Sequence, residues 1–241
     1  MVSTPLDIPI VRAPGERRLY AIAALVAILI VFAGFAPTYY LKGAFGTPDL
    51  STLKHVHGLV MTAWFALFLT QALLVAKGRT ATHRKLGVAG ALLALLVVVV
   101  ATTLAIASAR SGSSPIGVPP LIFLVIPLGE MVMFAGLVTA AVVMRKRSAY
   151  HKRLMLLASI AILAPAIARL PFDFIQTGSP LVFFGLTDLV ILACIGFDVA
   201  KNRRLHPAFA AGLVFVVVTQ IGRLALSQTP QWMTFAKWLV A

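Results

Sequence analysis

Residues 54–90 read KHVHGLVMTAWFALFLTQALLVAKGRTATHRKLGVAG, two apolar stretches joined by a short basic turn. In the first stretch, residues three or four positions apart form one stripe along a helix, and this stripe includes His57, Met61 and Gln71. The rest of that helix is nearly all Leu, Ala, Val, Thr or Phe, so the stripe is predicted to face protein and the remainder lipid. The second stretch begins at His83 and carries small residues on one face. The pattern predicts a helical hairpin inside a membrane.

The composition of the whole chain agrees with a membrane location. Hydrophobic residues make up 60% of the sequence and charged residues 12%, with a mean hydropathy of +0.97. A soluble domain carries about 25% charged residues, so the chain is predicted to be built for lipid. The single cysteine, Cys194, lies inside an apolar run, which excludes a disulfide framework and a cysteine-based zinc or iron-sulfur site.

Apolar segments of about 20 residues fill most of the chain, and a segment of this length spans a bilayer as a helix. The sequence predicts an all-α bundle of seven transmembrane helices in one domain, 18–227, after a polar tail, 1–17. The last part, 228–241, carries Trp232 and Trp238 and is predicted to lie at the membrane interface. The predicted spans are 19–40, 55–77, 83–108, 119–144, 151–170, 180–200 and 207–227.

The distribution of positive charge predicts the orientation. The formal net charge is +14, and most Lys and Arg residues fall in alternate loops. By the positive-inside rule these loops are cytoplasmic, so the N-terminus is expected in the cytoplasm and the C-terminus outside a bacterial inner membrane. Their charge then meets lipid headgroups, and we expect no nucleic acid as partner. The residues are Arg12, Arg17, Arg18, Lys77, Arg79, Arg84, Lys85, Arg145, Lys146, Arg147, Lys152, Arg153, Lys201, Arg203 and Arg204.

Polar residues inside the predicted spans form a first candidate site. Ionisable groups in a membrane are costly and indicate function when a partner is available. Pro127 and Pro165 break two of the spans near these groups. Two interpretations stay open, namely structural ion pairs that hold helices in register and a pocket for a ligand, proton or metal. The residues are Glu130, Asp188, Arg169, Arg223, His57 and Gln71.

Histidines at the predicted cytoplasmic side form a second candidate site. His83, His151 and His206 each open a helix after a basic loop, and Asp198 ends the sixth span. Three His and one Asp are a reasonable zinc or iron ligand set, although the surrounding Lys and Arg raise the cost of binding a cation. The alternatives are histidines that contact headgroups or helix ends, and a pair that ligates a haem from opposite faces.

His55 and His57 lie at the outer end of the second span. They are about 200° apart around a helix, so both face one metal only if the helix begins at or after them. His57 is a candidate metal or haem ligand together with Glu130 or Asp188, and the alternative is hydrogen bonding to the preceding loop. Glycine-rich phosphate loops, GxSxG and HExxH are absent from the sequence.

The segments HGLVMTAWFALFLTQ and GRTATHRKLGVAG resemble bacterial multi-pass membrane families of unknown function, which share a His-Gly helix followed about 25 residues later by HRxLG. More distantly, they are similar to b-type membrane cytochromes and ferric reductase-like proteins, whose helices hold haem. His57, Met61, His83 and Gly87 carry this resemblance, over about 37 residues. Those cytochromes place haem ligands as pairs across two helices. The resemblance therefore implies at most one haem, between His83 and either of the other two inner histidines.

Several functions follow as hypotheses. The first is a haem- or metal-binding redox protein or respiratory accessory factor, with haem b or a divalent metal as cofactor. The second is a small-solute or proton-coupled transporter that uses the intramembrane charged residues. The third is a zinc-dependent membrane hydrolase that uses the inner histidines. A structural subunit that binds other membrane proteins remains an alternative.

Overall fold

The structure, a computed structural model, describes residues 14–114 and 117–241, and these residues form helices and loops without any strand. Seven helical segments of this described part are long and apolar enough to cross a membrane, which confirms the predicted all-α bundle. They are Arg18–Tyr40, Thr52–Ala76, Thr80–Arg110, Pro120–Lys146, Ser148–Ile167, Pro180–Asn202 and Pro207–Leu226.

Shorter elements complete the chain, so that several spans consist of more than one helix. The elements are α1 (Pro14–Phe35), the π-helical turn η1 (Ala36–Tyr40), α2 (Thr52–Ala76), α3 (Thr80–Arg110), α4 (Pro120–Phe123), α5 (Val125–Val143), the 3-10 turn η2 (Met144–Lys146), α6 (Ser148–Ala161), α7 (Ala164–Ile167), α8 (Asp173–Gln176), α9 (Pro180–Asn202), α10 (Pro207–Leu226) and α11 (Pro230–Val240). Residues 1–13 of the predicted tail lie outside the described residues.

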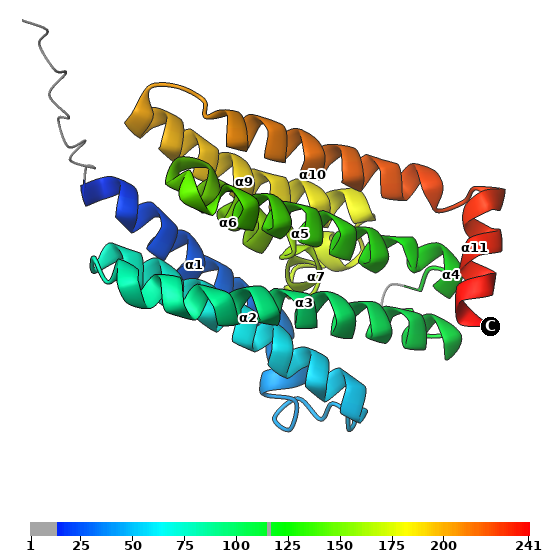
Figure 1. The fold of residues 1–241 in the computed structure, drawn as a ribbon. Coiled ribbons are helices and arrows are strands. Elements are labelled where there is room, and N and C mark those ends of the chain that lie inside the picture. The colour runs from blue at the N-terminus through cyan, green and yellow to red at the C-terminus, as the bar shows by residue number, and fades with distance from the viewer. Residues whose placement is uncertain (1–13, 115–116) are drawn as a thin grey trace, which may run out of the picture.

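The two ends of the bundle differ in charge. The turns α2–α3, α5–α6 and α9–α10 gather at one end, at the left of Figure 1, and these turns with the helix ends beside them carry 12 of the 21 Lys and Arg residues. We call this the basic end. At the opposite end, α11 lies across the bundle, where Trp232 is buried and its indole N–H donates to the Leu121 carbonyl at 2.8 Å. Trp238, on the same helix, is 71% exposed, and the location of this segment at a membrane interface stays a prediction.

Small residues allow the helices to approach closely. A Cβ on Gly34 of α1 would lie 2.1 Å from the backbone oxygen of Ala166, so only glycine fits against α7. On α3, the predicted small-residue face meets α2, because a Cβ on Gly90 would lie 3.2 Å from the Leu67 side chain. Dispersion contacts between closely packed backbones stabilise membrane helix pairs, which gain no hydrophobic energy from leaving lipid.

Two spans are interrupted in the half of the bundle away from the basic end. The fifth span turns at Ile162 and Leu163, and Pro165 lies in the short helix α7 that follows. The fourth span breaks at Leu124 between α4 and α5, and Pro127 has no N–H to donate within α5. These interruptions leave backbone carbonyls available to side chains.

Candidate functional site

Five ionisable side chains from five segments gather in the half of the bundle away from the basic end. The charges of Arg223 and Arg169 both act on Glu130. Asp188 interacts electrostatically with Arg223, and His57 with Arg169. We call these residues the charged cluster, and they are five of the six residues of the first candidate site. They come from α2 (His57), α5 (Glu130), the segment after α7 (Arg169), α9 (Asp188) and α10 (Arg223).

Arg223 is fixed by its backbone acceptors and an aromatic ring. The side chain is only 5% exposed. Its Nε donates to the Thr219 carbonyl at 3.1 Å, and its Nη1 donates to the Ile126 carbonyl on α5, also at 3.1 Å. The guanidinium lies over the Phe184 ring, 4.8 Å from the centroid. A stacked guanidinium keeps its charge while its position is restricted.

Arg169 is held in the same way on the other side of the cluster. Its Nη1 donates to the Pro165 carbonyl at 2.6 Å, at the interrupted part of the fifth span. The guanidinium lies over the Phe35 ring at the end of α1, 4.8 Å from the centroid. Within the described residues, neither Arg169 nor Arg223 has a carboxylate oxygen within the 4.0 Å of an ion pair.

Glu130 is the buried acid of the cluster. It is 5% exposed, and its Oε1 has no hydrogen-bond partner among the described residues. A buried polar atom without a partner costs about 1–3 kcal/mol, and more when the group is charged. Such an atom, within electrostatic range of two arginines, is unlike a structural ion pair, in which the carboxylate would contact a guanidinium directly. Within the described residues, Glu130 forms no direct ion pair with Arg169 or Arg223.

Asp188 and Gln220 connect α9 to α10 beside the cluster. The amide Nε2 of Gln220 donates to Oδ1 of Asp188 at 3.0 Å. Gln220 is 4% exposed and lies one turn before Arg223. Gln220 was not among the predicted site residues, because a single glutamine in an apolar helix carries no motif. Its position three residues before Arg223, on the same face of the helix, was the feature of the sequence that could have identified it.

Gln71 and His55 lie outside the cluster, although both were candidates. Gln71 donates from its amide to the His83 carbonyl at 3.3 Å, near the basic end. Gln71 is 14 residues after His57, about 21 Å along a helix at 1.5 Å per residue, so the two share a face but not a depth. His55 meets Tyr39, whose hydroxyl donates to the His55 carbonyl at 3.2 Å.

The inner histidines divide into a pair and a helix cap. The rings of His83 on α3 and His151 on α6 lie 6.2 Å apart between centroids, at 76° to each other. Nδ1 of His151 lies 2.8 Å from the Ala141 carbonyl. His206 instead caps α10, since its Nδ1 accepts from the Ala208 N–H at 3.1 Å, and its ring packs on Tyr150.

The metal set of three His and Asp198 does not assemble. Asp198 forms a two-pronged ion pair with Arg153, whose Nη2 lies 2.7 Å from Oδ1 and whose Nε lies 3.1 Å from Oδ2. Both side chains are buried. Within residues 14–114 and 117–241, no group of three or more His, Cys, Asp or Glu side chains is placed to hold a metal ion. The carboxylate is occupied because a buried arginine needs a counter-charge.

A haem with two axial histidines needs fewer ligands than such a metal set. His83 and His151 fit its donor requirement in part, since they come from two helices. A hydrogen bond from His151 Nδ1 to the Ala141 carbonyl would leave Nε2 available for iron.

Comparison with family models, with curated proteins and with solved structures finds no match to this chain.

Proposed function

We propose that this chain is a membrane transporter that takes up a small monovalent anion together with a proton, using the charged cluster as its binding site. One observation supports this most directly. Two arginines are each fixed by an aromatic ring and backbone carbonyl oxygen, yet neither has a carboxylate in ion-pair contact among the described residues. The planar guanidinium matches a carboxylate or similar oxyanion in geometry.

The charge balance of the cluster supports coupling to a proton. With Glu130 and Asp188 ionised and His57 neutral, the two acids offset Arg169 and Arg223. A bound monovalent anion would leave one uncompensated negative charge in the membrane, which is costly. One proton on Glu130 restores neutrality, so anion and proton bind most favourably together.

Interrupted helices lie next to the site. Transporters commonly bind their substrates where membrane helices are discontinuous. Here Arg169 bonds the carbonyl of Pro165 in the fifth span, and Arg223 bonds the carbonyl of Ile126 just after the break at Leu124. A shift of α7, which carries Pro165, would therefore move Arg169 relative to Glu130 on α5.

Uptake into proteoliposomes tests the proposal. The purified protein is reconstituted with an acidic exterior, and uptake of radiolabelled lactate, pyruvate and gluconate is measured. We expect accumulation of at least one anion, reduced at least tenfold in Arg223→Met. Glu130→Gln, which mimics the protonated acid, should keep anion exchange but lose accumulation driven by the pH gradient. Asp173→Asn, which removes an exposed carboxylate on α8, is the matched control.

Two results would contradict this function. One is the absence of uptake for every anion in folded protein. The other is an Arg223→Met variant that transports as fast as the parent protein.

For the orientation, we propose the bacterial inner membrane, with the basic end in the cytoplasm. The asymmetry of Lys and Arg between the two ends supports this. A C-terminal alkaline phosphatase fusion should then be active and a C-terminal green fluorescent protein fusion dark, and the reverse pattern would contradict the orientation.

A second candidate function is electron transfer through one haem, supported by the separation of His83 and His151. When bound, haem would supply one-electron chemistry, and the two histidines would hold its iron. A visible spectrum of purified protein, before and after dithionite, tests this. A reduced b-type absorption should be lost in His83→Ala and His151→Ala but kept in His206→Ala, whose histidine caps a helix. A hydrolase using these histidines and zinc gains no support from the described residues.

A further inference from the structure

A groove on the side of the bundle runs between α5, α6 and α10, toward the basic end. Its volume is about 750 Å3. Small residues form both walls, and larger ones stand at the basic end. The lining includes Gly136 and Ala140 on α5, Ala208 and Ala211 on α10, and Met144 with Tyr150 at the basic end.

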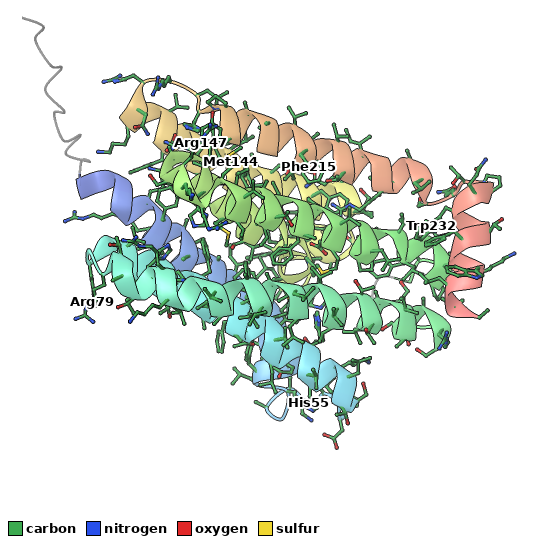
Figure 2. All side chains as sticks on the ribbon, viewed as in Figure 1. His55, Arg79, Met144, Arg147, Phe215 and Trp232 are labelled. Atoms are coloured by element: carbon green, nitrogen blue, oxygen red, sulfur yellow. The ribbon has the colours of Figure 1, made fainter. Side chains whose placement is uncertain are left out.

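The groove is apolar and lies along membrane-spanning helices. All three helices that form it belong to spans long and apolar enough to cross a bilayer, and a bilayer around these spans would bring lipid chains to the groove. Small side chains on facing helices leave a channel for a slender alkyl chain. Phe215 packs over Gly136, since a Cβ there would lie 3.2 Å from its ring, and Figure 2 shows Phe215 well along α10 from the basic end.

The contact between Gly136 and Phe215 also argues against a second helix in this groove. Helix pairs in membranes use small residues so that two backbones can meet. The approach to the Gly136 backbone is already taken by the Phe215 ring of the same chain. A flexible chain is better suited than a rigid helix to the space that remains.

Positive charge surrounds the basic end of the groove. Figure 2 shows Met144 and Arg147 together at this end. Three exposed basic residues directly follow Met144, and segment 201–204, just before the lining residue Pro207, carries three more. Neither 144–153 nor 199–207 contains an acid in the sequence, and the nearby Asp198 is buried against Arg153. The exposed cations are Arg145, Lys146, Arg147, Lys201, Arg203 and Arg204.

We propose that this groove is a binding site for an anionic phospholipid, with an acyl chain between α5 and α10 and its phosphate among the cations of the basic end. The apolar walls of the groove would contact the acyl chain, and the cations would contact the phosphate of the headgroup. Basic residues beside a groove between membrane helices recognise anionic lipid headgroups through charge-assisted hydrogen bonds. A zwitterionic lipid could place an acyl chain in the groove equally well, but its headgroup would be attracted less strongly by the cations.

Native mass spectrometry tests the lipid site. The protein is purified from nanodiscs of phosphatidylcholine alone or of phosphatidylcholine with phosphatidylglycerol in equal amounts. We expect one phosphatidylglycerol to remain bound per chain at detergent levels that remove phosphatidylcholine. The double variant Ala140→Phe with Ala211→Phe fills the groove, and Arg147→Gln with Arg204→Gln removes charge. Each should reduce retention at least tenfold.

Matched controls separate the site from general lipid contact. Val132→Phe adds a ring to an exposed position of α5 that does not line the groove, and Lys54→Gln removes a charge at the start of α2. Both should retain the lipid like the parent protein. Folding is checked with a thiol-reactive dye, because Cys194 is buried in the native protein.

Other outcomes would overturn the proposal. Equal retention of both lipids, or unchanged retention in the folded filled variant, would show that the groove does not select an anionic lipid. A dimer that dissociates when the groove is filled would identify a second copy of the chain as the occupant.

Discussion

A Cβ atom on Gly129 would lie 2.4 Å from Cδ and 2.5 Å from Cγ of Arg223. The backbone of α5 and the arginine stem of α10 therefore share a space that only glycine leaves open. On its other side, the guanidinium rests on Phe184. Glu130 directly follows this glycine in the sequence. The position of Arg223 near Glu130 therefore requires that residue 129 has no side chain.

We predict that Gly129→Ala disrupts the cluster. The added methyl group forces Arg223 off its carbonyl partners, so anion uptake should fall at least tenfold and the melting temperature should drop. Gly222→Ala is the control, since a Cβ there meets nothing within 4 Å. It should match the parent in uptake and be no less stable, because alanine favours a helix over glycine by about 1 kcal/mol. Equal effects of the two substitutions would contradict the packing argument.

The ion pair between Arg153 and Asp198 gives a second prediction. Asp198→Ala leaves a buried guanidinium without its carboxylate, so the free energy of unfolding should fall by about 3–5 kcal/mol. The double variant Arg153→Leu with Asp198→Leu should recover much of that loss, because neither charge remains. Thermal unfolding in mild detergent measures both. An Asp198→Ala variant as stable as Asp173→Asn would show that the pair contributes little.

The seven spans were predictable because each requires about 20 predominantly apolar residues, and such runs can be read directly from the sequence. The convergence of Glu130, Arg169 and Arg223 was predictable for a related reason, since charges in a membrane need partners. The aromatic supports were not. Phe35 and Phe184 come from helices distant in sequence, and an apolar helix has too many phenylalanines for spacing alone to select them.

Two misplaced candidates show where periodicity was insufficient. Gln71 shares a helical face with His57, but residues on one face can lie at different heights along the helix axis. The helix rise places Gln71 near the basic end, away from His57. Asp198 was expected beside the histidines, whereas Arg153 was assigned to a headgroup-facing loop. The structure buries that arginine at 3% exposure, so the acid pairs with it. A basic run does not reveal which of its members turns inward.

The cap formed by His206 predicts a pH dependence of stability. Burial lowers the pKa of His206 below its ordinary value of 6.5, and Arg153 lowers it further, while Asp198 acts in the opposite direction. The unfolded chain therefore binds more protons at this residue, so stability rises with pH. This contribution is present above about pH 6.5 and is lost as the pH falls through the lower folded value.

Tryptophan fluorescence during thermal unfolding, followed from pH 7.5 to 5, tests this dependence. His206→Asn keeps a side chain able to cap α10 without titrating in this range, so its melting temperature should vary less with pH. His206→Ala should lose about 1 kcal/mol of stability at pH 7.5, where the cap is intact. If the parent and His206→Asn share one pH profile, His206 is not the group responsible.

The end of α1 links helix packing to the charged cluster. Gly34 brings α1 against the Ala166 carbonyl, and the next residue, Phe35, then covers the Arg169 guanidinium. We expect Phe35→Leu, which keeps an apolar side chain but removes the ring face, to weaken anion binding in proteoliposome uptake by roughly twofold to thirtyfold. That range corresponds to a cation–π contact of about 0.5–2 kcal/mol. Phe45→Leu, in an exposed loop, is the control. Uptake in Phe35→Leu equal to the control would mean that the ring does not position Arg169, and that the Pro165 carbonyl alone holds it.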